Sequence, residues 1–273
     1  MAKKILSAVA LVALWMLLWQ LIFIATGSKA WKFAPPLDVV KDLWDGLVPH
    51  KVIGELWQEY IQGERPETYS GKVLRGIIAS LIRVLYGYGI ALVLGVIVGL
   101  LLVSSRFFEW LLGPLILGIQ SLPSICWLPL AILWFGLGEN AILFVVLMGS
   151  LGSITIATRD GLRQVPVTYQ RVAATFGAAP MQRMLWVNVP AALPVFISGL
   201  KQGWSFAWRS LLAGELLYRS ISAGSLLMDA RELNDYPRMF AVMIMIVLVS
   251  ILIDRILFAK LEARIHARWG LAK

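Results

Sequence analysis

The chain has 273 residues, of which 59% are hydrophobic and only 15% are charged, and its mean hydropathy is +0.77. This composition is typical of a polytopic membrane protein and excludes an ordinary soluble domain. One cysteine and two widely separated histidines exclude an intramolecular disulfide and a plausible zinc or haem site, so we expect no metal site and no redox chemistry.

Six segments are long and apolar enough to cross the roughly 30 Å of hydrocarbon in a bilayer, which takes about 20 residues each. They are residues 5–27, 77–103, 110–136, 140–158, 192–217 and 238–257. The first follows two lysines, as a signal peptide would, but it is rich in Trp and Leu and has no small-residue cleavage site. We therefore expect it to be retained. The sequence predicts an all-α membrane bundle of about six transmembrane helices.

Basic residues are unevenly distributed over the predicted loops. With the N-terminus inside, the cytoplasmic pieces (1–4, 104–109, 159–190 and 255–273) hold 12 basic and 3 acidic residues. The outer pieces (28–73 and 218–237) hold 8 basic and 10 acidic residues. This bias predicts a multi-pass membrane protein with both termini in the cytoplasm. In a bacterial cell, we expect that membrane to be the inner membrane. The net charge of +9 is then a topology signal, because nucleic-acid binding would need a soluble basic face.

The segment after the first span has an organisation of its own. Beyond Pro35-Pro36, apolar residues recur at helical spacing among acidic ones: Leu37, Val40, Leu43, Trp44 and Leu47. This pattern predicts an amphipathic helix on the outer membrane face or on top of the bundle. Residues 54–72 read as a solvated connector, the alternative being a surface that receives an extracellular binding protein.

The third span is interrupted by Pro123 and Pro129. Two prolines this close remove backbone donors and do not fit one regular lipid-facing helix. Backbone carbonyl groups that lose their hydrogen bonds inside the membrane are tolerated where they are buried in protein or line a water-filled cavity. Polar and aromatic residues near the break are therefore candidates to line a substrate pathway: Gln120, Ser121, Ser124 and Trp127. A kinked helix packed against its neighbours is the alternative.

Small residues dominate the fourth span: Gly149, Ser150, Gly152, Ser153, Thr155 and Ala157. Small side chains let backbones approach closely, which is how helices associate in lipid. We interpret this span as a packing helix first, and as a polar lining only second.

The fifth span contains three charged residues, Lys201, Arg209 and Glu215. A charge at the bilayer centre costs at least about 2.5 kcal/mol, so it should face the bundle or water. We expect Lys201 to reach the inner interface and Glu215 the outer one, which leaves Arg209 as the most deeply committed charge. The pathway candidates in this span are Trp204, Ser205, Trp208 and Arg209. The alternative for Arg209 is a structural ion pair, for instance with Glu215.

The predicted cytoplasmic loop carries a small-residue pattern, Arg171-Val172-Ala173-Ala174-Thr175-Phe176-Gly177, followed by a turn that ends at Val189-Pro190. It resembles the coupling loop of permease subunits of binding-protein-dependent ABC importers, which reads E-A-A-x-x-x-G, nine variable positions, then I-x-L-P. The spacing from Gly177 to Pro190 fits, and Arg171 stands where the family has glutamate.

Two further patches resemble permeases for nitrate, sulfonate, taurine and related compounds. In the third span, Pro123 and Pro129 are followed by Trp134-Phe135-Gly136-Leu137-Gly138-Glu139, similar to the family's P…P…W-F-G-x-G-E pattern. In the fifth span, Trp208 and Gly214-Glu215-Leu216 resemble its W…E-L pattern. The resemblance covers about residues 77–257.

The resemblance implies a type I importer permease: a homodimer of this chain, two cytoplasmic ATP-binding subunits and an extracytoplasmic binding protein. It implies that Arg171, Ala173, Ala174, Gly177 and Pro190 form the ATPase-coupling loop. It also implies that ATP and Mg²⁺ bind the partner ATPase, with no cofactor on this chain. The expected organisation is 1–76 for the first span and outer segment, 77–257 for the permease core with its loop at 159–190, and 258–273 for a basic tail.

Two other classes fit the sequence less well. The chain lacks the G-x-x-x-x-G-K-[ST] motif and is not expected to be an enzyme or to hydrolyse ATP by itself. A secondary transporter or channel would need no ATPase, but a transporter should show internal repeats with matching broken helices, and we find one break and no repeat. The expected cargo is a small anion, open among nitrate, sulfonates, taurine, bicarbonate and thiamine-precursor-like compounds.

Overall fold

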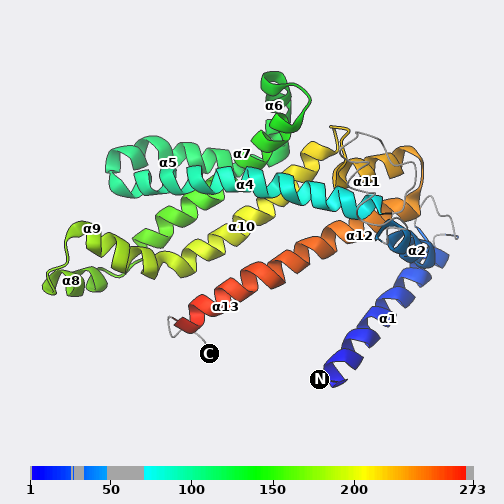
Figure 1. Cartoon of the computed structure of the whole chain (residues 1–273), viewed down its shortest axis with the longest axis horizontal. Coiled ribbons are helices and arrows are strands. Elements are labelled where there is room, and N and C mark those ends of the chain that lie inside the picture. Colours follow the sequence, from blue (N-terminus) through cyan, green and yellow to red (C-terminus); the bar gives the residue numbers. More distant parts are fainter. Residues whose placement is uncertain (1, 26, 28–33, 48–70, 269–273) are drawn as a thin grey trace. The chain divides into compact units, whose positions relative to one another are not determined.

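The computed structural model describes residues 2–25, 27, 34–47 and 71–268, with the backbone alone for residues 2–13 and His266. Every regular element in these residues is helical, which confirms the predicted all-α class (Figure 1). The elements are α1 (Ala2–Ala25), α2 (Pro36–Leu47), α4 (Lys72–Ser104), α5 (Arg106–Ser121), the 3-10 turn η1 (Ser124–Trp127), α6 (Leu128–Phe135), α7 (Glu139–Arg163), α8 (Val167–Thr175), α9 (Pro180–Arg183), the π-helix η2 (Met184–Asn188), α10 (Val189–Glu215), α11 (Ala223–Glu232), α12 (Tyr236–Ile253), the π-helix η3 (Asp254–Phe258) and α13 (Ala259–Arg268).

Within the described residues, four helical stretches are long and apolar enough to cross a membrane, or five if the bent pair α5 and η1–α6 counts as one span. The four are Lys72–Ser104, Glu139–Arg163, Pro180–Glu215 and Tyr236–Ile265. The four stretches and the bent pair together coincide with five of the six predicted spans. The remaining prediction falls on α1, in which Leu14–Ala25 forms a shorter apolar helix.

Contacts along the chain divide it into two compact units, residues 1–80 with 215–248, and residues 81–214 with 249–273. In the first unit, α2 is the predicted amphipathic helix, but its faces differ from the expectation. Val39 is the fully buried residue, packed with Ala34 and Ala241, whereas Leu37 and Trp44 are 76% and 66% exposed. The predicted connector at 54–72 lies almost wholly outside the described residues.

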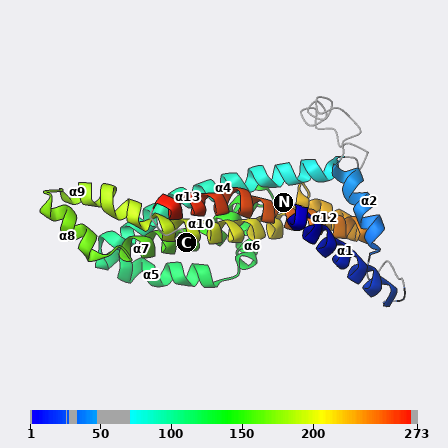
Figure 2. The same ribbon diagram turned by 90° about the horizontal axis from the view of Figure 1, so that it is seen from below.

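Helix α7 is the centre of the second unit and lies along α4, α5 and α10 (Figures 1 and 2). Most of its apolar window, 61%, is buried, against 33% for that of α4. The face of α4 toward α7 carries a small residue at every fourth position: Gly87, Ala91, Gly95 and Gly99. A Cβ added at Gly95 would lie 2.8 Å from Ile154 Cγ2, so the two backbones are already as close as they can come.

Helix α10 approaches α7 in the same way. A Cβ added at Gly199 would lie 1.9 Å from Ala157 Cβ, and one added at Gly203 would lie 3.1 Å from Ile154 Cγ1. The small residues predicted to pack in the fourth span are indeed in contact or buried: Ser150, Ser153, Thr155 and Ala157 are at most 7% exposed. The prediction of a packing helix is therefore confirmed.

Ion pairs join the ends of α7 to its neighbours. Arg83 of α4 binds Glu139 through Nε–Oε2 (2.6 Å) and Nη2–Oε1 (2.7 Å) contacts, a bidentate geometry. At the other end, Arg163 binds Glu109 of α5. These pairs fix the positions of α4 and α5 along α7.

We predict that Gly99→Ala destabilises the protein by roughly 1–3 kcal/mol, the usual range for overpacking. The new methyl group would lie 2.5 Å from Thr158 Cβ and 2.9 Å from the Thr155 carbonyl oxygen, and neither can move far because both belong to α7. The matched control is Gly89→Ala in the same helix, whose Cβ would meet nothing within 4 Å. Thermal unfolding in detergent should show a lower Tm for Gly99→Ala alone, and equal values would contradict the packing described above.

Candidate functional site

The predicted break of the third span is a sharp turn. Helix α5 ends at Ser121, Leu122 and Pro123 are extended, and the axis of the following helical segment is bent by 104°. Pro129 lies in the first turn of α6, where a missing N–H leaves no hydrogen bond unmade. The break is confirmed, but the second half of the predicted span does not continue along the first.

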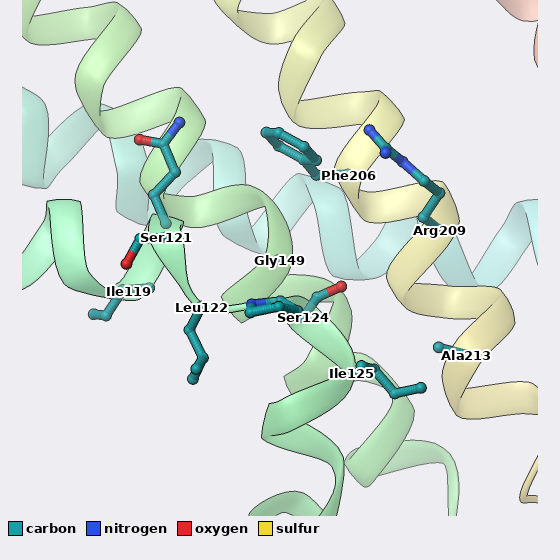
Figure 3. Close-up of a pocket in the computed structure, with 11 residues that line it drawn as sticks. Ile119, Ser121, Leu122, Ser124, Ile125, Gly149, Phe206, Arg209 and Ala213 are labelled. Atoms are coloured by element: carbon teal, nitrogen blue, oxygen red, sulfur yellow. The ribbon is translucent and has the colours of Figure 1, made fainter.

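A cavity of about 350 Å³ lies at this turn (Figure 3). It is lined by Ile119, Gln120, Ser121, Leu122, Pro123, Ser124, Ile125, Gly149, Phe206, Arg209 and Ala213. The residues come from the end of α5, the break itself, α7 and α10. The structure thus brings together four of the predicted pathway residues, Gln120, Ser121, Ser124 and Arg209, from two distant parts of the sequence.

Arg209 is the charged residue of this cavity. Its Nε donates a hydrogen bond to the carbonyl oxygen of Ser205 (3.0 Å), and its guanidinium carbon lies 5.0 Å from the centre of the Phe206 ring. In the part of the chain that the structure describes, no carboxylate pairs with Arg209. Its positive charge is therefore available to the cavity.

The carboxylate suggested as its alternative partner is engaged elsewhere. Glu215 is fully buried in the first unit, where it accepts hydrogen bonds from the Ser80 hydroxyl (2.7 and 2.8 Å) and from the Gly224 N–H (3.2 Å). The Ser80 oxygen in turn accepts from the Ala223 N–H (3.0 Å). Glu215 therefore does not extend into water: its carboxylate is buried against the start of α11, in the predicted outer piece 218–237.

Lys201, expected to reach the inner interface, forms ion pairs within the second unit. Its Nζ lies 3.0 Å from Asp254 Oδ1 and 4.0 Å from Glu262 Oε2. Asp254 is the first residue of the π-helix η3. The pair joins α10 to the C-terminal helix, a contact that sequence reasoning missed because the partners are far apart in the chain.

Four predicted pathway residues do not line the cavity. Trp204 and Trp208 are 5% and 3% exposed, and Trp204 packs edge-on against Tyr88 at 5.4 Å. Trp127 packs against Phe144 at 6.4 Å. Ser205 is exposed outside the cavity lining and takes part only through its carbonyl. Trp204 and Trp208 follow the small-residue face of α10 into the protein core, and that is the physical reason they are not at the cavity.

The structure also adds lining residues that the sequence analysis missed, chiefly Phe206 and Gly149. The sequence could have indicated Phe206 through its helical spacing from Arg209. Phe206 precedes Arg209 by three positions, so the two share a face of α10. Gly149 faces the break because a Cβ there would lie 3.2 Å from Ser124 Cβ.

The predicted coupling loop is an exposed helical hairpin between α7 and α10, at one end of the second unit (Figure 1). Helix α8 ends at Thr175, and Gly177 follows with φ +78°, a left-handed conformation that favours glycine. The Gly177 N–H donates to Ala174 O (2.9 Å) and the Ala178 N–H to Ala173 O (3.1 Å), which terminates the helix. Arg171, Ala174 and Gly177 are exposed, and Ala173 is half-buried.

Pro190 does not end this hairpin as predicted. It is the second residue of α10, and the helical stretch is continuous over Pro180–Glu215. The π-helix η2 precedes it, with the Val189 N–H bonded to Met184 O. The wider π-turn accommodates the missing proline N–H within a continuing helix.

Large apolar side chains of the hairpin are exposed. Phe176 is 86% exposed, Trp186 80% and Met181 68%. Exposed apolar patches mark contacts with another protein or with the membrane. The hairpin that carries these side chains is directly connected to the helix that carries Arg209.

We predict that the cavity is reached by water. In a Cys126→Ser background, which removes the exposed native thiol, Ser124→Cys and Arg209→Cys should react with a small water-soluble thiol reagent. Ala207→Cys is the control, because Ala207 is 0% exposed two residues before Arg209. Labelling followed by mass spectrometry would contradict the prediction if the Ser124→Cys thiol reacts no faster than the Ala207→Cys thiol.

The chain is similar in sequence to known permease proteins. The chain is 30% identical over 179 residues to the nitrate import permease protein NrtB of Synechocystis sp., a match covering 66% of this chain and 65% of that protein. It is 30% identical over 200 residues to the putative aliphatic sulfonates transport permease protein SsuC of Bacillus subtilis, covering 73% of this chain and 72% of that protein.

Among solved structures, the chain is similar to one of the MetNI methionine ABC transporter in inward-facing conformations. The TM-score is 0.63 at 18% identity, over 74% of this chain and 99% of that one. This likeness supports the type I importer permease fold. Residues 91–266 match the family described as the binding-protein-dependent transport system inner membrane component. The chain therefore belongs to that family of ABC importer permeases, which are transport subunits of the membrane.

Proposed function

We propose that this chain is the translocating subunit of an ATP-driven importer, and that it works as a homodimer with two cytoplasmic ATP-binding subunits and an extracytoplasmic binding protein. The observation that carries the proposal is the exposed α8–α9 hairpin, joined without interruption to a helix that lines a polar cavity. One hairpin per chain calls for two chains to engage two ATPases symmetrically. ATP and Mg²⁺ would bind the partner subunits.

The distribution of charge supports the orientation this requires. The four pieces predicted to be cytoplasmic, which include the hairpin and both termini, carry 12 basic and 3 acidic residues. By the positive-inside rule these pieces face the cytoplasm, where an ATPase would meet the hairpin. The cavity-forming turn after α5 then lies toward the outer side, where a binding protein would release its cargo.

Docking of the hairpin would rest on its apolar side chains. Phe176, at the end of α8, extends into solvent with 86% of its surface exposed. Burial of such a side chain in a groove on the ATPase would stabilise the contact by about 1.5–3 kcal/mol. Arg171, in place of the family's glutamate, adds an exposed positive charge to α8.

We predict that Phe176→Asp abolishes ATPase binding and uptake, because it replaces a buried apolar contact with an unpaired charge. Phe176→Leu is the matched control and should retain both. Coexpression with the partner ATPase subunit, followed by native mass spectrometry, should give a two-to-two complex for the wild type and the Leu variant. A Phe176→Asp complex of normal stoichiometry and uptake would rule out this docking mode.

The substrate that the cavity fits best is a small anion such as nitrate or a sulfonate. Arg209 supplies one fixed positive charge, and Gln120, Ser121 and Ser124 supply amide and hydroxyl groups around it. In the low dielectric of the membrane interior, Coulomb attraction is several-fold stronger than in water. One charge per subunit attracts an anion without holding it too tightly to leave. The named substrates of NrtB and SsuC are anions as well.

We predict that Arg209→Ala lowers uptake of the anionic substrate about ten-fold or more, the usual effect of losing a hydrogen bond to a charged group. Arg209→Lys keeps the charge and should retain a larger share of the activity. Initial rates of nitrate and aliphatic sulfonate uptake, with the ATPase complex quantified in the same membranes, measure the effect. Equal rates for Arg209→Ala and wild type would show that the anion does not use this charge.

A further inference from the structure

Helix α13 continues the last membrane-crossing helix beyond the bilayer. The apolar stretch Tyr236–Ile265 has 30 residues, and at 1.5 Å per residue it is about 45 Å long. The hydrocarbon layer is only about 30 Å thick. About ten residues therefore emerge, and α13, the charged end of this helix, is the part that does so.

Contacts with α10 fix which face of α13 turns inward. Phe258, just before α13, is 4% exposed, and its ring lies 6.3 Å from that of Trp204. One turn later, Glu262 accepts a hydrogen bond from the Ser198 hydroxyl (3.5 Å) and lies 4.0 Å from Lys201 Nζ. The side of α13 that carries Glu262 therefore faces α10.

A row of basic residues occupies the opposite side. Lys260, Arg264 and Arg268 follow one another at four-residue spacing and are all exposed. With 3.6 residues per turn, Lys260 and Arg264 lie about 160° from Glu262 around the helix, and Arg268 about 120°. In the described part of the chain none of the three forms an ion pair. We call these three residues the α13 basic row.

We propose that the α13 basic row binds the headgroups of anionic phospholipids, such as phosphatidylglycerol. The row begins where a membrane-crossing helix leaves the hydrocarbon, so its side chains lie at the depth of the lipid phosphates. Arginine forks match phosphate oxygens in bidentate geometry, and lysine adds a point charge. Leu261 and Ala263, both exposed, flank the row on either side and can rest on the acyl chains.

The lipid surface fits the row better than an acidic protein surface does. A headgroup layer presents phosphates along the full length of the row, at the level set by the helix itself. Each basic residue near an anionic membrane strengthens binding about five-fold, and this attraction fades within a Debye length of the surface. The inward face of α13, held by Phe258 and Glu262, keeps the row turned toward lipid.

The test uses the full chain purified in a neutral detergent and titrated with phosphatidylglycerol or phosphatidylcholine, with bound lipids counted by native mass spectrometry. The neutral variant is Lys260→Gln/Arg264→Gln/Arg268→Gln. The matched control is Lys260→Arg/Arg264→Lys/Arg268→Lys, which keeps every charge. Circular dichroism in phosphatidylcholine establishes that all three proteins are equally folded.

We expect the wild type and the charge-conserving variant to bind phosphatidylglycerol alike, in preference to phosphatidylcholine, and more weakly as salt rises. The neutral variant should lose about ten-fold or more of this preference. Phosphatidylglycerol binding by the neutral variant at the wild-type level would overturn the proposal. So would a loss in the charge-conserving variant as large as that in the neutral one. Loss of the ATPase complex with unchanged lipid binding would identify the row as a protein contact instead.

Discussion

The close approach of α4 and α10 to α7 is the constraint on which the second unit depends. Helices in lipid gain little from burying apolar side chains, so they associate where small residues allow backbone contact. Here the contact is made at Gly95 and Gly99 of α4 and at Gly199 and Gly203 of α10, and each added Cβ would meet α7 within 3.1 Å. The broken span also packs closely on α7, because a Cβ added at Gly152 would lie 2.8 Å from Gln120 Cβ of α5. The cavity lies where the broken end of α5 and helix α10 meet α7 at Gly149.

Polar chemistry at the cavity follows from the interruption of α5. Because the chain turns at Leu122 and Pro123, Ser121 and Ser124 line the cavity rather than continuing a lipid-facing helix, although the Ser121 hydroxyl donates to the Gly118 carbonyl oxygen (2.8 Å) (Figure 3). An arginine in a bilayer costs at least about 2.5 kcal/mol unless it faces water or polar groups. Arg209 meets that requirement with a carbonyl oxygen, an aromatic ring and the cavity. The cavity that makes Arg209 tolerable in an apolar helix is also what makes its charge accessible to an anion.

Much of this could be predicted from the sequence, because long apolar runs, paired prolines and small-residue spacing are local signals. The spans, the break near Pro123 and the packing role of Gly152 are of that kind. The spacing of small residues in α10 also indicates which side of the helix faces the cavity, but the sequence analysis did not use it for that purpose. Gly199, Gly203 and Ala207 define the packed face, and Trp204 follows it into the core, whereas Arg209 lies off it. Contacts such as Ser80 with Glu215 were out of reach, because 135 residues separate the partners.

Helix α10 links the exposed hairpin to the cavity, and its contacts determine how a movement could pass along it. Gly199 and Gly203 press it against α7 near its middle, and Lys201 ties the same turn to Asp254 of η3. The hairpin lies on one side of this held turn and Arg209 on the other, about eight residues or 12 Å further along. The far end of α10 is held as well, because Leu211 and Glu215 are fully buried. A displacement of the hairpin would therefore reach Arg209 only together with a shift of the contacts that hold α10 on both sides of it.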